Sequence, residues 1–245
     1  MSKKHLIFLH GFLENAKMWN PILNSLDTTD WQLHLPEIPG HGNNAELVTP
    51  NMLEYVENIH GQLQIPADEP YFFIGHSMGG YMGAHYCTQY AENCIGLLLF
   101  HSKASDDDDE KKAARNRAIE AAQQNQSLYV RTMINGLFPD STRAQFEKDI
   151  ETQISYAQAL PTMAITNALT VMRDRESRLQ ALIASQIPVH YFLGSEDKSI
   201  PQQIALAEIQ QLPNVTFHLE QNVGHMGHIE CVNSVVDYFG KALSS

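Results

Sequence analysis

The stretch FFIGHSMGGYMGA, residues 72–84, passes from an apolar run into glycine, histidine and serine, and then into small residues. Gly75, Ser77 and Gly79 fit the pattern G-x-S-x-G, directly after a predicted strand and before a predicted helix. A serine at so sharp a turn has strained backbone, and side chains two positions to either side would clash, so glycine is needed there. The turn predicts an exposed nucleophile, Ser77, beside the free N–H groups that begin a helix.

Short apolar runs on both sides of this turn predict strands that are buried on both faces of a parallel sheet. The runs cover residues 5–9, 31–35, 71–75, 95–100, 188–194 and 215–219. Helical stretches, for example over residues 52–63, 78–90 and 204–212, lie between them. Alternating strands and helices indicate a three-layer α/β fold with right-handed crossovers.

The alternation stops between residues 102 and 184, where the segments look helical and no strand signal appears. A helical insertion between two strands is typical of a lid. We therefore expect residues 1–101 and 185–245 to form the core and residues 102–184 to form a helical lid or cap. The larger apolar side chains of this lid either form its underside or pack within it; they are Met133, Phe138, Tyr156, Met163 and Met172.

An unaided serine hydroxyl is a weak nucleophile and needs a general base. The segment VGHMGHIE, residues 223–230, follows the last predicted strand and contains two histidines. We assign His225 as the base, because it follows Gly224 on the strand side of this loop. His228 is treated as a loop histidine without a chemical role.

The base needs a carboxylate that fixes its tautomer and stabilises its charged form. The segment YFLGSEDKSIP, residues 191–201, follows the preceding predicted strand and contains two acids. We choose Asp197 and expect Glu196 to be exposed. The catalytic residues then follow in the chain order Ser77, Asp197, His225, which is the order of α/β-hydrolases.

The oxyanion that forms on the substrate needs two backbone donors. We expect these to be the N–H groups of Met78, just after the nucleophile, and of Phe12, in the loop after the first strand. Gly11 permits close backbone approach in this loop, and the Phe12 side chain either lines the pocket or belongs to the core. We further expect Gly11, His76, His101 and Trp19 to line the pocket, with helix packing as the alternative for Trp19.

Five motifs in order resemble the α/β-hydrolase fold superfamily, and more narrowly its small lidded hydrolases, which include many carboxylesterases and C–C bond hydrolases. They are HGF (10–12), PEIPGHG (36–42), GHSMGG (75–80), GSEDKSIP (194–201) and GHMGHIE (224–230). The resemblance covers nearly the whole chain. It implies a mostly parallel sheet of about six strands in the spatial order four, three, five, six, seven, eight of the family count, with the N-terminal hairpin of the family absent. Members with an aspartate nucleophile are disfavoured by Ser77.

The composition of the chain limits the kinds of partner that it can bind. Its 245 residues include 28 acidic and 16 basic side chains, for a net charge of −12, so nucleic acid and anionic membrane surfaces are unlikely partners. No apolar run approaches the roughly 20 residues of a membrane span. The short apolar run near the N-terminus lacks a cleavage site, so we predict a cytoplasmic protein. Three cysteines do not suggest a disulfide framework.

The sequence therefore predicts a serine hydrolase that cleaves a small or medium acyl substrate, most simply a carboxylic ester, through an acyl-enzyme. We expect a small-molecule acyl substrate, no cofactor and no metal, because no histidine pair has zinc-ligand spacing, and a monomer or homodimer. Two alternatives stay open. The same triad could cleave a C–C bond or act as a lyase, with Arg131, Arg143 or Arg173 of the lid facing a substrate carboxylate. The chain could also sense a ligand with little turnover.

Overall fold

The computed structural model describes residues 3–244, which contain one sheet of six strands. The strands are β1 (Lys4–Leu9), β2 (Trp31–His34), β3 (Tyr71–His76), β4 (Cys94–Phe100), β5 (Val189–Gly194) and β6 (Val215–Glu220). They are ordered β2-β1-β3-β4-β5-β6, and every pairing is parallel. The expected fold class, strand segments and spatial order are confirmed. The carboxyl ends of all six strands consequently meet at one edge of the sheet.

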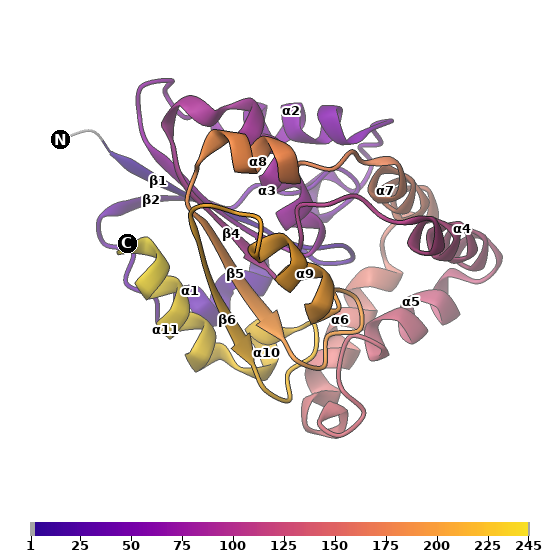
Figure 1. Ribbon diagram of the computed structural model, residues 1–245. Helices are drawn as coiled ribbons and strands as arrows, with labels where there is room; N and C mark the ends of the chain where they lie inside the picture. Colours follow the sequence, from indigo (N-terminus) through magenta and orange to yellow (C-terminus); the bar gives the residue numbers. More distant parts are fainter. Residues whose placement is uncertain (1–2, 245) are drawn as a thin grey trace.

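Helices cover both faces of the sheet and give the fold its three layers (Figure 1). One face carries η1 (Ala16–Trp19), α1 (Asn20–Leu23) and α11 (Val232–Leu243), and the other carries α2 (Met52–Leu63), α3 (Met78–Gln89), α8 (Leu179–Ser185) and α9 (Gln202–Ile209). Successive strand residues point to opposite faces. Leu6 and Phe8 of β1 accordingly belong to the core on the α11 side, and Ile7 and Leu9 to the core on the α3 side. Both faces are buried, which explains the nearly continuous apolar runs.

Within the described chain, helices are the only regular elements between β4 and β5. They are α4 (Asp109–Gln124), α5 (Gln126–Asn135), η4 (Arg143–Phe146), α6 (Glu147–Gln158) and α7 (Thr162–Asp174), followed by α8. Helix α4 begins where the Asp108 side chain accepts the Lys111 N–H, and Asp109 and Glu110 favour its positive end. Helices α4 to α7 lie together on one side of the molecule (Figure 1), whereas α8 packs on α3 beside the sheet. We call α4 to α7 the helical cover.

Short elements complete the chain: η2 (Gly42–Asn44), η3 (Ala91–Asn93) and α10 (Gly227–Glu230). Of these, α10 matters most for the site, because it directly follows the loop that contains His225. Within residues 3–244, no helix has the length and apolar character needed to cross a bilayer.

Candidate active site

The turn between β3 and α3 holds Ser77 in a strained backbone conformation. Its φ of 50° and ψ of −114° lie in a region that non-glycine residues rarely occupy, and such strain typically costs about 1–3 kcal/mol. A Cβ on Gly75 would lie 2.3 Å from the Gly79 carbonyl oxygen, and one on Gly79 would lie 2.4 Å from the Leu9 carbonyl oxygen. The predicted need for both glycines is confirmed. Ser102 Oγ further braces the turn by donating to the Ser77 carbonyl oxygen at 2.7 Å.

The loops after β5 and β6 bring Asp197 and His225 together. Asp197 Oδ2 lies 2.7 Å from His225 Nδ1, and both side chains are buried. The other carboxylate oxygen, Oδ1, accepts the N–H groups of Ser199 and Ile200 at 2.8 and 2.9 Å. With a proton on Nδ1, the imidazole of His225 presents an unprotonated Nε2, as a general base requires. Glu196 is exposed, as expected.

A second histidine contacts the same carboxylate. His101 follows β4 and donates from Nδ1 to Asp197 Oδ2 at 3.1 Å, while its Nε2 has no hydrogen-bond partner in the described chain. Burial lowers the pKa of His101 to about 4, so this ring is neutral at pH 7. Burial alone would raise the pKa of Asp197, but the adjacent His225 and His101 lower it well below its usual range. Asp197 is therefore a carboxylate wherever the protein is folded at moderate pH.

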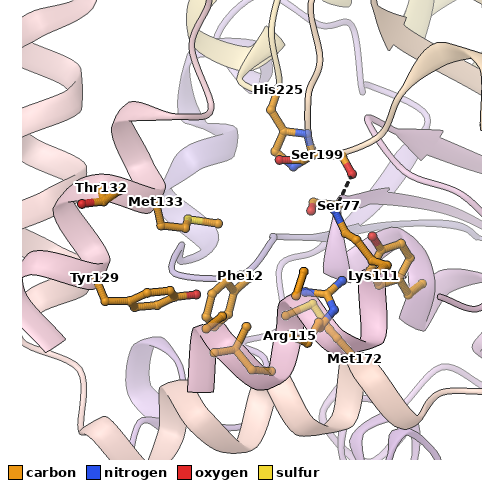
Figure 2. Close-up of a pocket in the computed structure, with 14 residues that line it drawn as sticks. Phe12, Ser77, Lys111, Arg115, Tyr129, Thr132, Met133, Met172, Ser199 and His225 are labelled. Atoms are coloured by element: carbon orange, nitrogen blue, oxygen red, sulfur yellow. Dashed lines mark hydrogen bonds between the residues drawn. The ribbon is translucent and has the colours of Figure 1, made fainter. Parts of the chain in front are cut away.

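Ser77 and His225 both line a cavity of about 340 Å³ between the strand ends and the helical cover. Figure 2 shows this cavity, and its dashed line is the hydrogen bond from Lys111 Nζ to the Ser199 carbonyl oxygen, 3.1 Å long. Its wall is formed by Phe12, Ser77, Tyr81, Lys111, Ala114, Arg115, Ala118, Tyr129, Thr132, Met133, Leu169, Met172, Ser199 and His225. The Phe12 side chain thus lines the cavity, which is the first of the two roles considered for it.

The two expected oxyanion donors are free to act. The N–H of Phe12 donates no hydrogen bond within residues 3–244, and the N–H of Met78 is in the first turn of α3, where helical acceptors are lacking. The loop that presents Phe12 is fixed on both sides. Gly11 N–H donates to Glu14 Oε2 at 2.7 Å, and Leu13 N–H donates to His41 Nε2 at 3.0 Å. Phe12 lines the cavity and Met78 directly follows Ser77, and their role as oxyanion donors stays a prediction.

Gly11, His76, His101 and Trp19 do not line this cavity, which corrects our expectation. Trp19 lies in the core on the opposite face of the sheet, against Phe8. His76 and His101 lie behind the cavity wall. His76 contacts the backbone of His225, and His101 contacts Asp197. Gly11 is a close-approach position, because a Cβ there would lie 2.5 Å from a Glu14 carboxylate oxygen.

Glu14 is a buried carboxylate that sequence reasoning missed. Its Oε2 accepts from His76 Nδ1 at 2.7 Å, and His76 Nε2 donates to the His225 carbonyl oxygen at 3.0 Å. Burial would lower the pKa of His76, but Glu14 raises it, and a ring that donates from both nitrogens is charged. Burial opposes the charge on Glu14, yet His76 lowers the pKa of Glu14 to about 2. This ion pair links the nucleophile turn to the base loop.

The three arginines considered as contacts for a substrate carboxylate instead pair with acids near the surface. Arg131, Arg143 and Arg173 contact Glu151, Asp140 and Asp174, respectively. The cations that line the cavity are Lys111 and Arg115, one turn apart on α4. Of the larger apolar side chains in this helical segment, Met133 and Met172 line the cavity, Phe138 is buried, and Met163 is 64% exposed.

Two buried clusters consist of side chains that can bind metal ions. They are Glu14 with His76 and His228, and Asp197 with His101 and His225, and within each cluster the potential ligand atoms lie within 4.8 Å of one another. Each cluster contains an N···O separation of 2.7 Å, which is a hydrogen-bond distance. Two ligands of one tetrahedral zinc ion lie about 3 Å or more apart. The spacing favours hydrogen-bonded networks, and the expectation of no metal stays a prediction.

Buried histidines make the protein sensitive to acid. Burial lowers the pKa of five of them from 6.5 to about 3 or 4: His41, His85, His101, His190 and His228. Between pH 6.5 and 4 the unfolded chain therefore binds more protons than the folded chain, so the free energy of unfolding falls as the pH falls. His76 acts in the opposite direction, because its pKa is raised.

We expect the free energy of unfolding to fall by about 3 kcal/mol or more between pH 7 and pH 5. Urea denaturation at pH steps from 8 to 4 would measure this change. A stability that stays constant down to pH 4 would show that these rings are protonated in the folded chain.

Comparison with known proteins identifies a matching family model and several similar proteins. A family model described as "alpha/beta hydrolase fold" matches residues 4–231. A pimeloyl-[acyl-carrier protein] methyl ester esterase of Edwardsiella ictaluri (strain 93-146) is 26% identical over 211 residues, covering 83% of this chain and 79% of that protein. A 2-succinyl-6-hydroxy-2,4-cyclohexadiene-1-carboxylate synthase of Enterobacter sp. (strain 638) is 25% identical over 236 residues, covering 92% and 86%. The structure of a thermophilic esterase from Thermogutta terrifontis matches with a TM-score of 0.87 at 22% identity, covering 99% of this chain and 90% of that one.

Proposed function

This chain belongs to the α/β-hydrolase fold family, and from that premise we propose that it cleaves a small carboxylic ester through a Ser77–His225–Asp197 triad. The observation that carries the proposal is the 2.7 Å contact between Asp197 Oδ2 and His225 Nδ1, because His225 lines the same cavity as the strained Ser77. A nucleophile and a base that line one cavity, with a buried acid that orients the base, form the arrangement that activates a serine.

In the proposed reaction, His225 Nε2 takes the proton of Ser77 Oγ as the oxygen attacks the ester carbonyl. The N–H groups of Phe12 and Met78 stabilise the negative charge on the carbonyl oxygen. The alcohol leaves with the proton from His225, which yields an acyl group on Ser77. Water, activated by His225, then hydrolyses this acyl-enzyme and regenerates the free serine.

A second candidate uses the same residues as a lyase that removes a proton from an anionic substrate. The specific observation in its favour is that Lys111 and Arg115 line the cavity, since cations there would hold a substrate carboxylate. The relative from Enterobacter carries the name of a synthase rather than an esterase. Esterase and lyase would differ in whether an acyl group is ever attached to Ser77. The predicted helical lid, whose boundaries at residues 102 and 184 stay proposals, would select the substrate in either case.

Initial rates on p-nitrophenyl esters from acetyl to dodecanoyl test the proposed esterase. A cavity of about 340 Å³ is at the small end of ligand sites, which span about 300–1,000 Å³. We therefore expect the highest kcat/KM for short acyl chains, with a steep decline toward dodecanoyl. If the folded protein hydrolyses none of these esters, the esterase proposal fails and the lyase becomes the leading candidate.

A further inference from the structure

Arg115 is a largely enclosed arginine whose two terminal amines have no partner within the described residues. Its Nε donates to Asp107 Oδ2 at 2.7 Å, and the side chain is only 12% exposed. Within residues 3–244 its two terminal amines donate no hydrogen bond, and the residue lines the cavity that contains Ser77. Arg115 and Lys111 project from the same face of α4 into this cavity (Figure 2). The amines therefore remain available from the cavity for the carboxylate of a ligand.

The carboxylate beside Arg115 is shared among several cations. Asp107 also accepts from Arg175 at 2.9 Å, and Lys103 Nζ lies 3.8 Å from it. Arg175 is held in turn over the Tyr81 ring, 3.8 Å from its centre. Asp107 therefore faces three cations, of which Lys103 is also near Glu208 and Asp106.

The cavity wall provides no carboxylate to balance this charge. Its lining contains Lys111 and Arg115 but no Asp or Glu. Lys111 donates to a neutral acceptor, the Ser199 carbonyl oxygen. Burial, together with the charge of Arg115, lowers the pKa of Lys111. Such a concentration of positive charge is unusual in a chain with a net charge of −12, and it favours an anionic ligand.

Two neutral hydroxyls add donors beside these cations. Tyr81 and Tyr129 both line the cavity, and neither hydroxyl forms a hydrogen bond within the described residues. Burial raises the pKa of both, of Tyr129 to about 12, so both keep their protons. The remaining wall is apolar and includes Leu169 and Met172.

We propose that Arg115, assisted by Lys111, binds a carboxylate in the acyl part of the substrate, so that the substrate class is a half-ester of a short dicarboxylic acid. The ester carbonyl would lie at Ser77, the methylene chain against the apolar wall, and the carboxylate at the terminal amines of Arg115. This inference rests on the proposed esterase function and narrows its substrate. A planar guanidinium binds a carboxylate through two parallel hydrogen bonds, which Lys cannot reproduce.

Monomethyl esters of dicarboxylic acids from succinate to adipate, compared with the matched dimethyl esters, test the subsite. The two sets share chain length and leaving group and differ in the charged end. We expect the wild type to prefer the monoester in kcat/KM. In Arg115→Gln this preference should fall by about 30- to 100-fold, as expected for the loss of hydrogen bonds to an ionised group, and Arg115→Lys should restore only part of it. Arg131→Gln, which removes an exposed arginine paired with Glu151, is the matched control and should keep the preference.

The outcomes separate the subsite from the esterase. Hydrolysis of both ester sets with no preference for the monoester overturns the subsite and leaves the esterase intact. If neither set is hydrolysed, the esterase fails, and thermal stabilisation by glutarate tests the subsite directly. Stabilisation of the wild type that is lost in Arg115→Gln supports the subsite, whereas no stabilisation of either protein overturns it.

Acetyl glycolate, which carries its carboxylate in the alcohol, should be a poorer substrate than the half-esters. Equal rates would contradict placement of the carboxylate in the acyl part.

Discussion

Ser77→Ala is expected to lower kcat on the best ester substrate by about 10⁴-fold or more, because no other group can form the acyl-enzyme. The N–H donors of Phe12 and Met78 and the cavity wall remain in this variant, so a small residual rate above the uncatalysed reaction should persist. Removing Oγ deletes no hydrogen bond of the described structure, since Ser77 takes part in the fold through its backbone. The fold and the thermal stability should therefore be retained, and the loss should appear in turnover alone.

Initial rates with purified wild type, Ser77→Ala and Ser244→Ala would measure this loss. Ser244 lies at the exposed C-terminal end of the described chain, so its variant controls for handling and purification. A folded Ser77→Ala protein that keeps more than a few per cent of wild-type activity would contradict a nucleophilic role for this serine.

Asp197→Asn should lower kcat by a similar factor, about 10⁴-fold, although it changes one atom. The N–H groups of Ser199 and Ile200 would keep the amide oxygen at the Oδ1 position, which leaves the NH₂ group facing His225. An NH₂ group cannot accept from Nδ1–H, so His225 would carry its proton on Nε2. In that tautomer the imidazole cannot take the proton of Ser77.

Glu196→Gln is the matched control for this variant, because Glu196 is the adjacent acid and is exposed. It should retain wild-type rates at every pH. The loss in Asp197→Asn should lessen at high pH, where a serine alkoxide forms without help from the base. Equal losses in the two variants, or none in Asp197→Asn, would show that Asp197 does not orient the base.

The fold could be predicted because each element has a local signal. The runs at residues 71–75 and 95–100 are apolar throughout, and β3 and β4 occupy them to within one residue. The glycines around Ser77 indicated a sharp strand-to-helix turn, and the structure has this turn. The loops that carry Asp197 and His225 follow consecutive strands of a parallel sheet, so their meeting at one edge was predictable from chain order.

The surroundings of the site depend on contacts that no local pattern encodes. Glu14 is three residues after Gly11 and resembles a loop acid, yet it pairs with His76, which is 62 positions away. Trp19 precedes a short helix, and the sequence does not indicate which face of the sheet this helix covers. The helical cover contains several arginines, and only the packing of α4 against α7 and α5 turns Arg115 toward the cavity while Arg131 stays exposed.

The central claim is that Ser77 is an activated nucleophile, and covalent labelling tests it most directly. A fluorophosphonate probe reacts with serines that a neighbouring base activates, and mass spectrometry locates the label. We predict one label per chain, on the peptide that contains Ser77, with none in Ser77→Ala and greatly slowed labelling in Asp197→Asn. A folded wild-type protein that takes up no label, or takes it up on another residue, would contradict the account.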